Sequence, residues 1–292
     1  MRPRRAVRRG AGDSRSGLLA VLTAILAPTT LLTAVMFYFG WSFSYHYFDS
    51  LGVEFTVLGF TTQDYLLRSV DPLFVPVVVL AALVLAVLWI YDLAAGRVGP
   101  ARLRVLGRRI APALVLCGAL LVGAGLYRLA GRTDLEFFLI ASPVALALGV
   151  LLLHLASACL RASPPSLTER AAVFVLVGIS VFWAAQLYAS EVGRIRAEQT
   201  VADLDGAPWT TVYSEKPLSI HAPDVVEQAC AAEDAAYGFR YTGLVLVLQS
   251  GDQYVLLPRS WAQLRAPAIV LPRSDAIRLE FAPRSSPQSS GC

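Results

Sequence analysis

The 292-residue sequence contains no asparagine, a single lysine (Lys216), three histidines and four cysteines. The lack of asparagine excludes every N-x-[ST] glycosylation acceptor, and four cysteines are too few to replace a hydrophobic core by disulfides. Charged residues are also scarce, at 16%, whereas hydrophobic residues reach 56%. A soluble domain has about 25% charged and about 45–50% apolar residues. The composition therefore excludes an ordinary soluble domain and indicates a membrane protein.

Five largely apolar stretches are long enough to cross a bilayer. A hydrocarbon core of about 30 Å requires about 20 helical residues, and no water is present there to bond free backbone groups. The sequence therefore predicts a membrane α-helical bundle over residues 17–190, with spans at about 17–40, 72–92, 110–129, 137–160 and 171–190. The first stretch is longer than the core of a signal peptide, so we expect an uncleaved anchor after a basic cytoplasmic N-terminus, 1–16.

The arginines indicate how these helices are oriented. Thirteen of them fall on one side of the predicted spans: Arg2, Arg4, Arg5, Arg8, Arg9, Arg15, Arg97, Arg102, Arg104, Arg108, Arg109, Arg161 and Arg170. The short loops of the other side hold only Arg68, Arg128 and Arg132. Basic residues in short loops stay cytoplasmic. We therefore expect a multi-pass protein of the cell membrane with its N-terminus inside and its C-terminus outside.

A long external loop, residues 42–71, joins the first two predicted spans. Thr61 and Asp64 fit a capping box, with aspartate in place of the usual glutamate. We expect a short helix over about 62–70, stopped before Pro72, that lies on the headgroup region or covers the bundle. Loops of this length are more often functional than mere connections.

After a juxtamembrane linker at 191–207, the hydrophobic pattern becomes that of strands. Six strands are expected, at 209–213, 218–221, 239–249, 253–257, 268–271 and 277–281. Turn residues at 250–252 and 272–275 predict two hairpins. Between the second and third strands, Asp224–Ala236 predicts a short helix.

These strands form a β-rich extracytoplasmic domain over residues 208–282, followed by a disordered tail at 283–292. A domain of about 75 residues is close to the lower size at which one core suffices. We therefore expect it to lean on the membrane or on the loop at 42–71.

The histidines are isolated. His154 lies near the cytoplasmic end of the fourth span, where an ionisable residue suggests a function but a single carbonyl is enough to satisfy a neutral imidazole. His46 is expected at the outer interface and His221 at a strand end. Neither has a partner at metal-ligand spacing, so the sequence predicts no zinc site.

The cysteines point to packing and leave one disulfide open. Cys117 and Cys159 lie in or beside spans, where a thiol packs as a small apolar group. Cys230 and Cys292 are both predicted on the outer side of the membrane, where an oxidising compartment permits a disulfide between them. The sequence does not decide whether this disulfide forms.

No arrangement of acidic or nucleophilic residues indicates catalysis. Asp92, Arg128 and Glu191 flank spans as solvated or snorkelling ends. The outer acids are scattered at spacings that define no catalytic pair: Glu54, Asp64, Asp134 and Glu136. The common nucleophile, phosphate-binding and metal motifs do not occur. We therefore predict no catalytic residue, no cofactor-binding residue and no metal ligand, and we expect a protein that is not an enzyme.

Small residues recur at four-residue spacing on two of the predicted spans. They are Ala119 and Gly123 on the third span, and Ala141, Ala145 and Gly149 on the fourth. Such faces let helices approach closely in a membrane. We expect the third and fourth spans to pack on each other, with homo-oligomerisation as the alternative.

Three stretches carry a resemblance to other proteins: YFDSLGVE at 47–54, TTQDYLLRS at 61–69 and YTGLVLVLQSGDQYVLLP at 241–258. They resemble multi-pass membrane proteins of GC-rich actinobacteria that have no assigned activity. The resemblance covers most of the chain from Trp41 onward. It implies no activity, cofactor or catalytic residue.

The predicted location of the external loop and of the β-rich domain is the main indication of function. The external loop and the β-rich domain are predicted on one side, which favours a non-enzymatic binding, sensing or assembly component. The alternative is a subunit of a small-solute transporter or channel, although the absence of mid-span charge argues against a self-contained transporter. The expected partners are the lipid bilayer and another membrane or envelope protein, with no nucleic acid. The sequence leaves the oligomeric state open.

Overall fold

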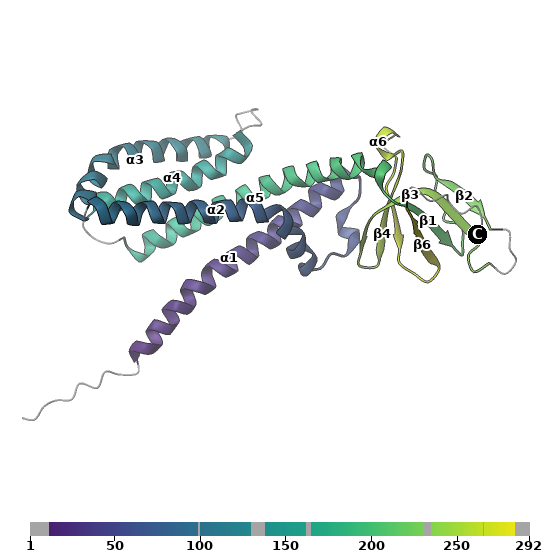
Figure 1. Cartoon of the computed structure of the whole chain (residues 1–292), viewed down its shortest axis with the longest axis horizontal. Coiled ribbons are helices and arrows are strands. Elements are labelled where there is room, and N and C mark those ends of the chain that lie inside the picture. The colour runs from purple at the N-terminus through teal and green to yellow at the C-terminus, as the bar shows by residue number, and fades with distance from the viewer. Residues whose placement is uncertain are drawn as a thin grey trace, which may run out of the picture. The chain divides into compact units, whose positions relative to one another are not determined.

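The computed structural model describes residues 12–98, 100–129, 138–161, 165–230, 235–264 and 266–283. In these residues the chain forms helices first and an antiparallel sheet last (Figure 1). The helices are α1 (Gly12–Ser50), η1 (Phe55–Leu58), α2 (Thr62–Val98), α3 (Pro100–Leu129), α4 (Phe138–Leu160), α5 (Leu167–Ala202), η2 (Leu204–Gly206) and α6 (Trp261–Leu264). The strands are β1 (Trp209–Ser214), β2 (Val226–Ala229), β3 (Phe239–Ser250), β4 (Gln253–Pro258), β5 (Ile269–Pro272) and β6 (Ile277–Ala282).

Four helices of the described chain are long and apolar enough to cross a membrane. They cover Thr62–Arg97, Val105–Tyr127, Ala141–Leu160 and Leu167–Ala202. These helices overlap the second to fifth predicted spans, and many of their large apolar side chains are exposed, such as Leu80 and Trp89. A soluble protein rarely exposes so large an apolar surface, whereas lipid accommodates it. The first predicted span falls within α1 and stays a prediction.

The chain divides into two compact units. One unit contains Met1–Tyr38 and Val77–Ala185, and we call it the helical unit. The other contains Phe39–Pro76 and Gln186–Cys292, and we call it the loop–sheet unit. The second unit brings the connection between α1 and α2 together with the strands, although more than 100 residues separate these segments in the sequence.

Helices α3 and α4 pack on each other in the helical unit, as the sequence predicts. A Cβ atom added to Gly149 would lie 2.8 Å from the carbonyl oxygen of Gly118, and one added to Gly125 would lie 3.1 Å from that of Ser142. The predicted face of α3 is wrong by one residue, because Ala119 is exposed and Gly123 faces open space. The observed contact residues recur at a seven-residue spacing, which is the period of a coiled-coil seam.

The ends of three helices approach closely in the loop–sheet unit. A Cβ atom on Gly40 of α1 would overlap the carbonyl oxygen of Tyr65 in α2. A Cβ atom on Gly193 of α5 would lie 2.8 Å from the carbonyl oxygen of Phe43 in α1. Only glycine permits backbones to approach this closely. The two glycines therefore fix where α1 crosses α2 and α5.

Helix α2 begins as the sequence predicts but ends elsewhere. The backbone N–H of Thr61 donates to Asp64 Oδ2 at 2.7 Å, and the N–H of Asp64 donates to Thr61 Oγ1 at 3.3 Å, so the capping box is confirmed. The predicted stop before Pro72 is wrong, because the helix runs on to Val98. A proline removes one intrahelical hydrogen bond and weakens the helix without always ending it. The predicted loop at 42–71 is therefore helical at both ends.

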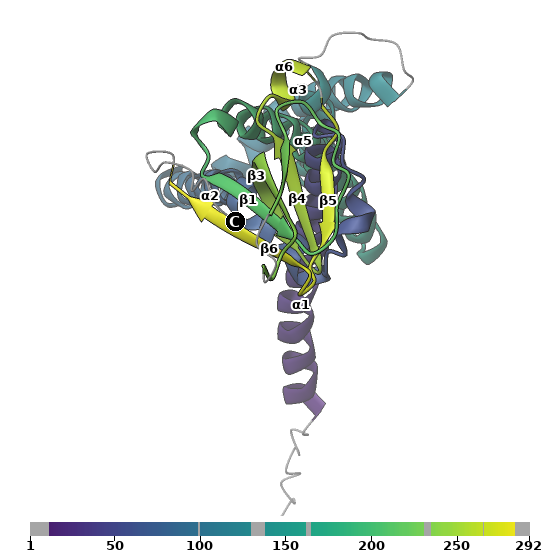
Figure 2. The ribbon, with the colours of Figure 1, turned by 90° about the vertical axis from the view of Figure 1, so that its right-hand side faces the viewer.

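The strands form one antiparallel sheet in the order β5-β4-β3-β1-β6, with β2 pairing only with the first part of β3. Figure 2 shows these strands side by side, nearly face-on. The predicted strands at 209–213, 239–249, 253–257, 268–271 and 277–281 are all present as β1, β3, β4, β5 and β6. The predicted β3–β4 hairpin is confirmed, with Ser250 paired to Gln253 and Gly251 at a φ of 52°.

Three predictions in this region are wrong. Residues 218–221 form no strand, and Asp224–Ala236 does not begin as a helix, because β2 occupies its first part. Asp224 has a φ of 60°, and its carbonyl oxygen would overlap a Cβ atom on Gly243, so this bend requires a glycine opposite. The turn at 272–275 makes no hairpin either, since β5 pairs with β4 and β6 pairs with β1.

Candidate functional site

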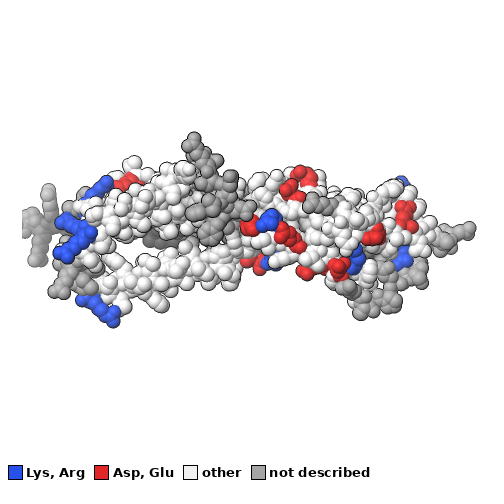
Figure 3. Space-filling model, turned by 90° about the horizontal axis from the view of Figure 1, so that it is seen from above, with Lys and Arg blue, Asp and Glu red and all other residues white. Residues whose placement is uncertain are grey.

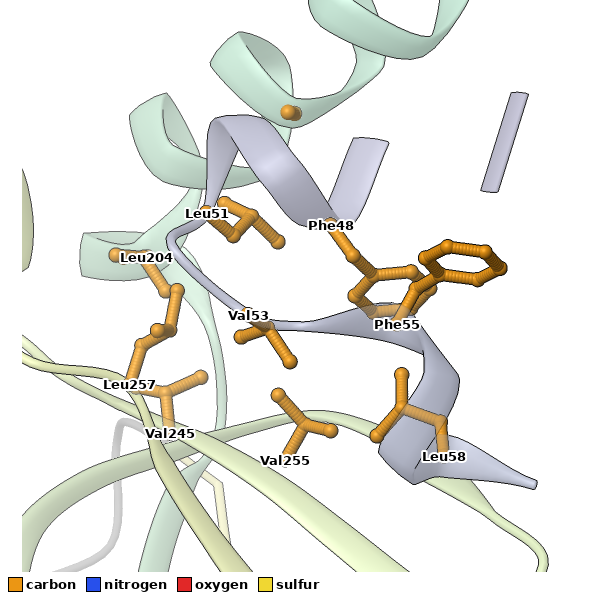
Figure 4. Close-up of a cluster of buried hydrophobic side chains, with 10 residues drawn as sticks. Phe48, Leu51, Val53, Phe55, Leu58, Leu204, Val245, Val255 and Leu257 are labelled. Carbon is orange, nitrogen blue, oxygen red and sulfur yellow. The ribbon is translucent and has the colours of Figure 1, made fainter. Parts of the chain in front are cut away.

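A cluster of buried apolar side chains joins the α1–α2 connection to the sheet. Figure 4 shows these side chains pointing toward one another from the connection, from the segment after α5 and from two strands. The cluster consists of Phe48, Leu51, Val53, Phe55, Leu58, Ala197, Leu204, Val245, Val255 and Leu257. The sequence predicted that the β-rich domain leans on the membrane or on the loop at 42–71, and the cluster shows contact with that loop.

The opposite face of the sheet has a second apolar cluster. It contains Val212, Tyr241, Leu244, Leu256 and Leu271, and Leu218, Ile220 and Val225 pack against it. The segment that was predicted to be the second strand therefore covers this face. The Tyr241 oxygen accepts a hydrogen bond from the Leu218 backbone N–H at 2.7 Å. Burial raises the pKa of the Tyr241 phenol.

Arg259 fastens η2, the short helix that follows α5, to the sheet. Its Nη1 donates to the carbonyl oxygen of Leu204 at 3.1 Å, and its Nη2 donates to that of Ala207 at 2.9 Å. Its guanidinium carbon also lies 3.8 Å from the centroid of the Trp209 ring. A guanidinium offers several donors in a fixed plane, and it stacks on aromatic rings. The arginine therefore holds the carbonyl groups of η2 and the start of β1 in one arrangement.

A second arginine lies in an aromatic cluster beside the connection. The Arg68 guanidinium carbon is 4.5 Å from the Phe60 ring centroid and 5.6 Å from that of Phe48. The Tyr47 hydroxyl lies 2.9 Å from Thr200 Oγ1, which ties α1 to α5. Burial raises the pKa of the Tyr47 phenol. These contacts therefore join α1, α2 and α5 to one another in the loop–sheet unit.

An open polar groove lies where the β3–β4 turn, the β5–β6 connection and the start of β3 meet. It has a volume of about 550 Å³. Its lining carries both signs of charge and two phenols: Tyr237, Asp252, Tyr254, Arg273, Ser274, Asp275, Ile277 and Arg278. The Arg273 backbone N–H donates to the Asp252 carbonyl oxygen at 2.7 Å, which holds the two turns together. The groove is open to solvent, and its lining offers charged and phenolic groups to a polar surface.

His154 lies beside an acidic residue in the helical unit. Its Nδ1 is 3.7 Å from Glu169 Oε1, and the same oxygen accepts a hydrogen bond from Ser157 Oγ at 3.1 Å. Arg161 pairs with the other oxygen of Glu169. The sequence did not single out Glu169, although Ser166 and Glu169 have the spacing of a capping box, and the Glu169 N–H donates to Ser166 Oγ at 3.2 Å.

The other two histidines lie apart. His46 is half-buried with its ring edge-on to Tyr45, and burial lowers its pKa. His221 is exposed, and its Nδ1 lies 2.7 Å from the Ser219 carbonyl oxygen. The described residues contain no group of three potential metal ligands.

The cysteines differ between the two units. Cys117 and Cys159 are free thiols in the helical unit. Cys230, in the loop–sheet unit, is disulfide-bonded. The sequence left a Cys230–Cys292 disulfide open, and Cys292 lies outside the described residues.

The acids that the sequence predicts on the outer side include two helix caps. Glu54 caps η1 by accepting from the Thr56 N–H at 3.3 Å, and Asp64 caps α2. Glu191 pairs with Arg194 at 2.8 Å, whereas Asp92 is exposed. Asp134 and Glu136, the Arg128 side chain and the tail from 284 onward lie outside the described residues.

Comparison with protein-family models, curated proteins and solved structures finds no match for this chain. The resemblance to actinobacterial multi-pass proteins therefore stays a prediction. Any proposal about function depends on the geometry of the molecule alone.

Proposed function

We propose that this chain is a five-span protein of the cell membrane whose loop–sheet unit is an extracytoplasmic surface for binding or assembly. The observation that carries the proposal is the apolar cluster around Leu58 and Leu257, which makes the α1–α2 connection and the sheet one body. A connection that only linked two spans would need no such core. The core instead gives the sheet a rigid support on the helix ends.

Two observations support the proposed topology. The residues that follow α1 and those that follow α5 belong to one packed unit, so they lie on the same side of any bilayer that the helices cross. This requires an even number of spans between the connection and the sheet, and the four helices α2 to α5 supply it. With α1 as the proposed fifth span, the N-terminus lies on the opposite side. Figure 3 shows the basic side chains of the helical unit gathered at one end, and the positive-inside rule assigns that end to the cytoplasm.

The thiols support the same orientation. A disulfide at Cys230 persists in an oxidising compartment, whereas free thiols are typical of reducing surroundings or of packing within spans. The disulfide lies in the unit that the arginines assign to the outside.

The polar groove is the proposed contact point for an envelope partner. A photoreactive amino acid at Tyr254, which lines the groove, tests this in native cells. The matched control carries the same group at Val226, which is exposed on β2 and absent from the groove lining. We expect Tyr254 to capture one reproducible envelope molecule that Val226 does not capture, and we expect Arg273→Glu to reduce the yield. Equal capture at both positions contradicts a binding role for the groove.

The alternative function, a subunit of a small-solute transporter or channel, has one observation in its favour. His154 and Glu169 bring two ionisable side chains to the same end of α4 and α5, and ionisable residues in membrane helices often mark ion paths. Purified protein in vesicles tests it. A solute or proton flux that needs only this chain and falls in His154→Gln favours transport, and no flux above empty vesicles contradicts it.

A further inference from the structure

The two edges of the sheet differ in their capacity to accept another strand. Strand β5 has four residues and ends in Pro272, and proline is one of the residues that protect an edge. Strand β6 has six residues without proline or glycine. It pairs with β1 on one side, and within the described residues no strand pairs with its other side.

The side chains along β6 are accessible. The Arg278 side chain is 58% exposed, Glu280 is 39% exposed and Phe281 is 57% exposed. Ile277 and Leu279 lie on the opposite face from the two charged residues and pack partly against the Tyr241 cluster. An accessible strand with one free row of backbone groups is a template for a further strand.

The sequence of β6 is complementary to itself in one antiparallel register. If two copies pair with Leu279 opposite Leu279, then Arg278 of each copy lies opposite Glu280 of the other, and Ile277 lies opposite Phe281. The neighbouring registers of the same face place Arg278 opposite Arg278 or Glu280 opposite Glu280. Opposite charges across strands stabilise a pair and like charges destabilise it, so the charges select the register centred on Leu279.

We propose that two copies of this chain associate through β6, which joins their sheets into one continuous antiparallel sheet about a two-fold axis at Leu279. The contact is isologous, as is usual in homodimers. In the single chain, Arg278 pairs with Glu280 of its own strand, and both side chains exchange this partner for that of the second copy.

The membrane permits this arrangement. The two-fold axis of an antiparallel strand pair runs perpendicular to the sheet. In Figure 2 the sheet is seen nearly face-on, along the direction in which the last turns of α5 run in Figure 1. In the loop–sheet unit the end of α5 is therefore nearly parallel to the axis. A rotation about this axis leaves the α5 ends of the two copies pointing the same way, as two copies that share one bilayer require.

The proposed contact buries little surface. The confinement of both copies to one bilayer explains how so small a contact can hold a dimer. A single six-residue strand pair buries less than the roughly 1,000 Å² expected of a stable interface in solution. Two copies held in one bilayer with their sheets at the same height meet at a much higher effective concentration than in solution. We therefore expect dimers in the membrane and monomers in dilute detergent.

A cysteine at the symmetry axis tests the register. Directly opposed residues in an antiparallel pair have Cα atoms about 4.5–5.5 Å apart, within the range that a disulfide bridges. In the full chain with Cys117→Ser and Cys159→Ser, we expect Leu279→Cys to give a disulfide-linked dimer in native membranes. The control is Phe281→Cys, because the two copies of that position are offset by four residues, or about 13 Å. No Leu279→Cys dimer, or equal yields for both cysteines, overturns the proposal.

Charge reversal at Arg278 in one copy and at Glu280 in the other distinguishes an ion pair between two copies from the ion pair within one strand. In the Leu279→Cys background, Arg278→Glu alone and Glu280→Arg alone each place like charges opposite each other, and we expect about ten-fold less dimer. When the two variants carry different tags and are made together, we expect heterodimers to recover the parental yield. Neither variant retains an Arg278–Glu280 pair within its own strand, so recovery reports contact between copies. Failure to recover, or a cross-link to a different protein in place of a second copy, contradicts the proposal.

Discussion

The helical unit and the loop–sheet unit bury different side chains. In the helical unit the buried contact positions are small residues such as Ala111, Gly118 and Gly149, while large side chains such as Leu83 are exposed. In the loop–sheet unit the fully buried side chains are large, among them Phe48 and Leu257. The helical unit also buries Leu146 and Val150, at 8% and 9% exposure, so the two units differ in which side chains they bury most deeply.

The difference in buried side chains follows from the two solvents, water around the loop–sheet unit and lipid around the helical unit. In water, removal of apolar surface drives folding, so the loop–sheet unit gathers its leucines and phenylalanines in a core. In lipid that driving force between helices is absent, and close backbone approach through small residues takes its place. The contrast predicts that large-to-small substitutions destabilise the loop–sheet unit and that small-to-large substitutions destabilise the helical unit.

The largest effect is expected for Leu58→Ala in η1. Leu58 is fully buried between the connection and the sheet, and a buried Leu→Ala change costs about 2–5 kcal/mol. Urea unfolding in micelles, followed by tryptophan fluorescence, measures it. The matched control is Val57→Ala, because Val57 lies in the same turn and is 53% exposed. Equal losses for both variants contradict the role of the core.

The second effect is expected for Gly149→Leu in α4. The side chain meets the Gly118 backbone, so α3 and α4 must separate at a cost of about 1–3 kcal/mol or more. Thermal denaturation of the purified protein in lipid nanodiscs measures the loss. Gly123→Leu is the control, since nothing lies within 4 Å of a Cβ at that position. A harmless Gly149→Leu refutes packing through this face.

A smaller effect is expected for Arg259→Lys. Lysine keeps the charge but loses the planar set of donors to Leu204 and Ala207 and the stacking on Trp209, so we expect a loss of about 1–2 kcal/mol. The urea titration described for Leu58→Ala measures it. The control is Arg273→Lys at an exposed position of the same unit. If both lysine variants are as stable as the parent, charge alone explains the role of Arg259.

The smallest effect is expected for Tyr241→Phe, at about 1 kcal/mol near neutral pH. The folded state holds the phenol proton to a higher pH than the unfolded state, because burial raises the Tyr241 pKa above its ordinary 10.0. This contribution is fully present below pH 10 and is lost as the pH rises above it. Stability measured against pH should therefore fall less steeply in the variant than in the parent. Parallel curves exclude a raised pKa at Tyr241.

The periodic parts of the fold were predictable from the sequence. Charge-free stretches predicted the long helices, five of the six strands predicted from alternation are present, and the Thr61–Asp64 capping box gave the start of α2. The continuation of α2 through Pro72 was not predictable, because a local rule about proline does not include the packing that keeps a helix together. The helix predicted from Asp224 failed for a similar reason, since its backbone lies against Gly243.

The candidate sites were less accessible to sequence reasoning. Arg259 and Leu204 are separated by 55 residues, and nothing in their local patterns indicates the contact. Glu169 carried a detectable signal in its capping-box spacing, but the position of its side chain beside His154 depends on how α4 and α5 pair. The self-complementary pattern of β6 is visible in the sequence, yet its meaning requires the observation that β6 is an edge strand.

Labelling by a membrane-impermeant maleimide in intact cells tests the two-solvent account most directly. Single cysteines would replace Val226 of the sheet and Leu83 of α2, both exposed, in a background with Cys117→Ser and Cys159→Ser. The account predicts fast labelling at position 226 from outside the cell and none at position 83, even after permeabilisation. Fast labelling at position 83, or labelling at position 226 only after permeabilisation, would contradict it.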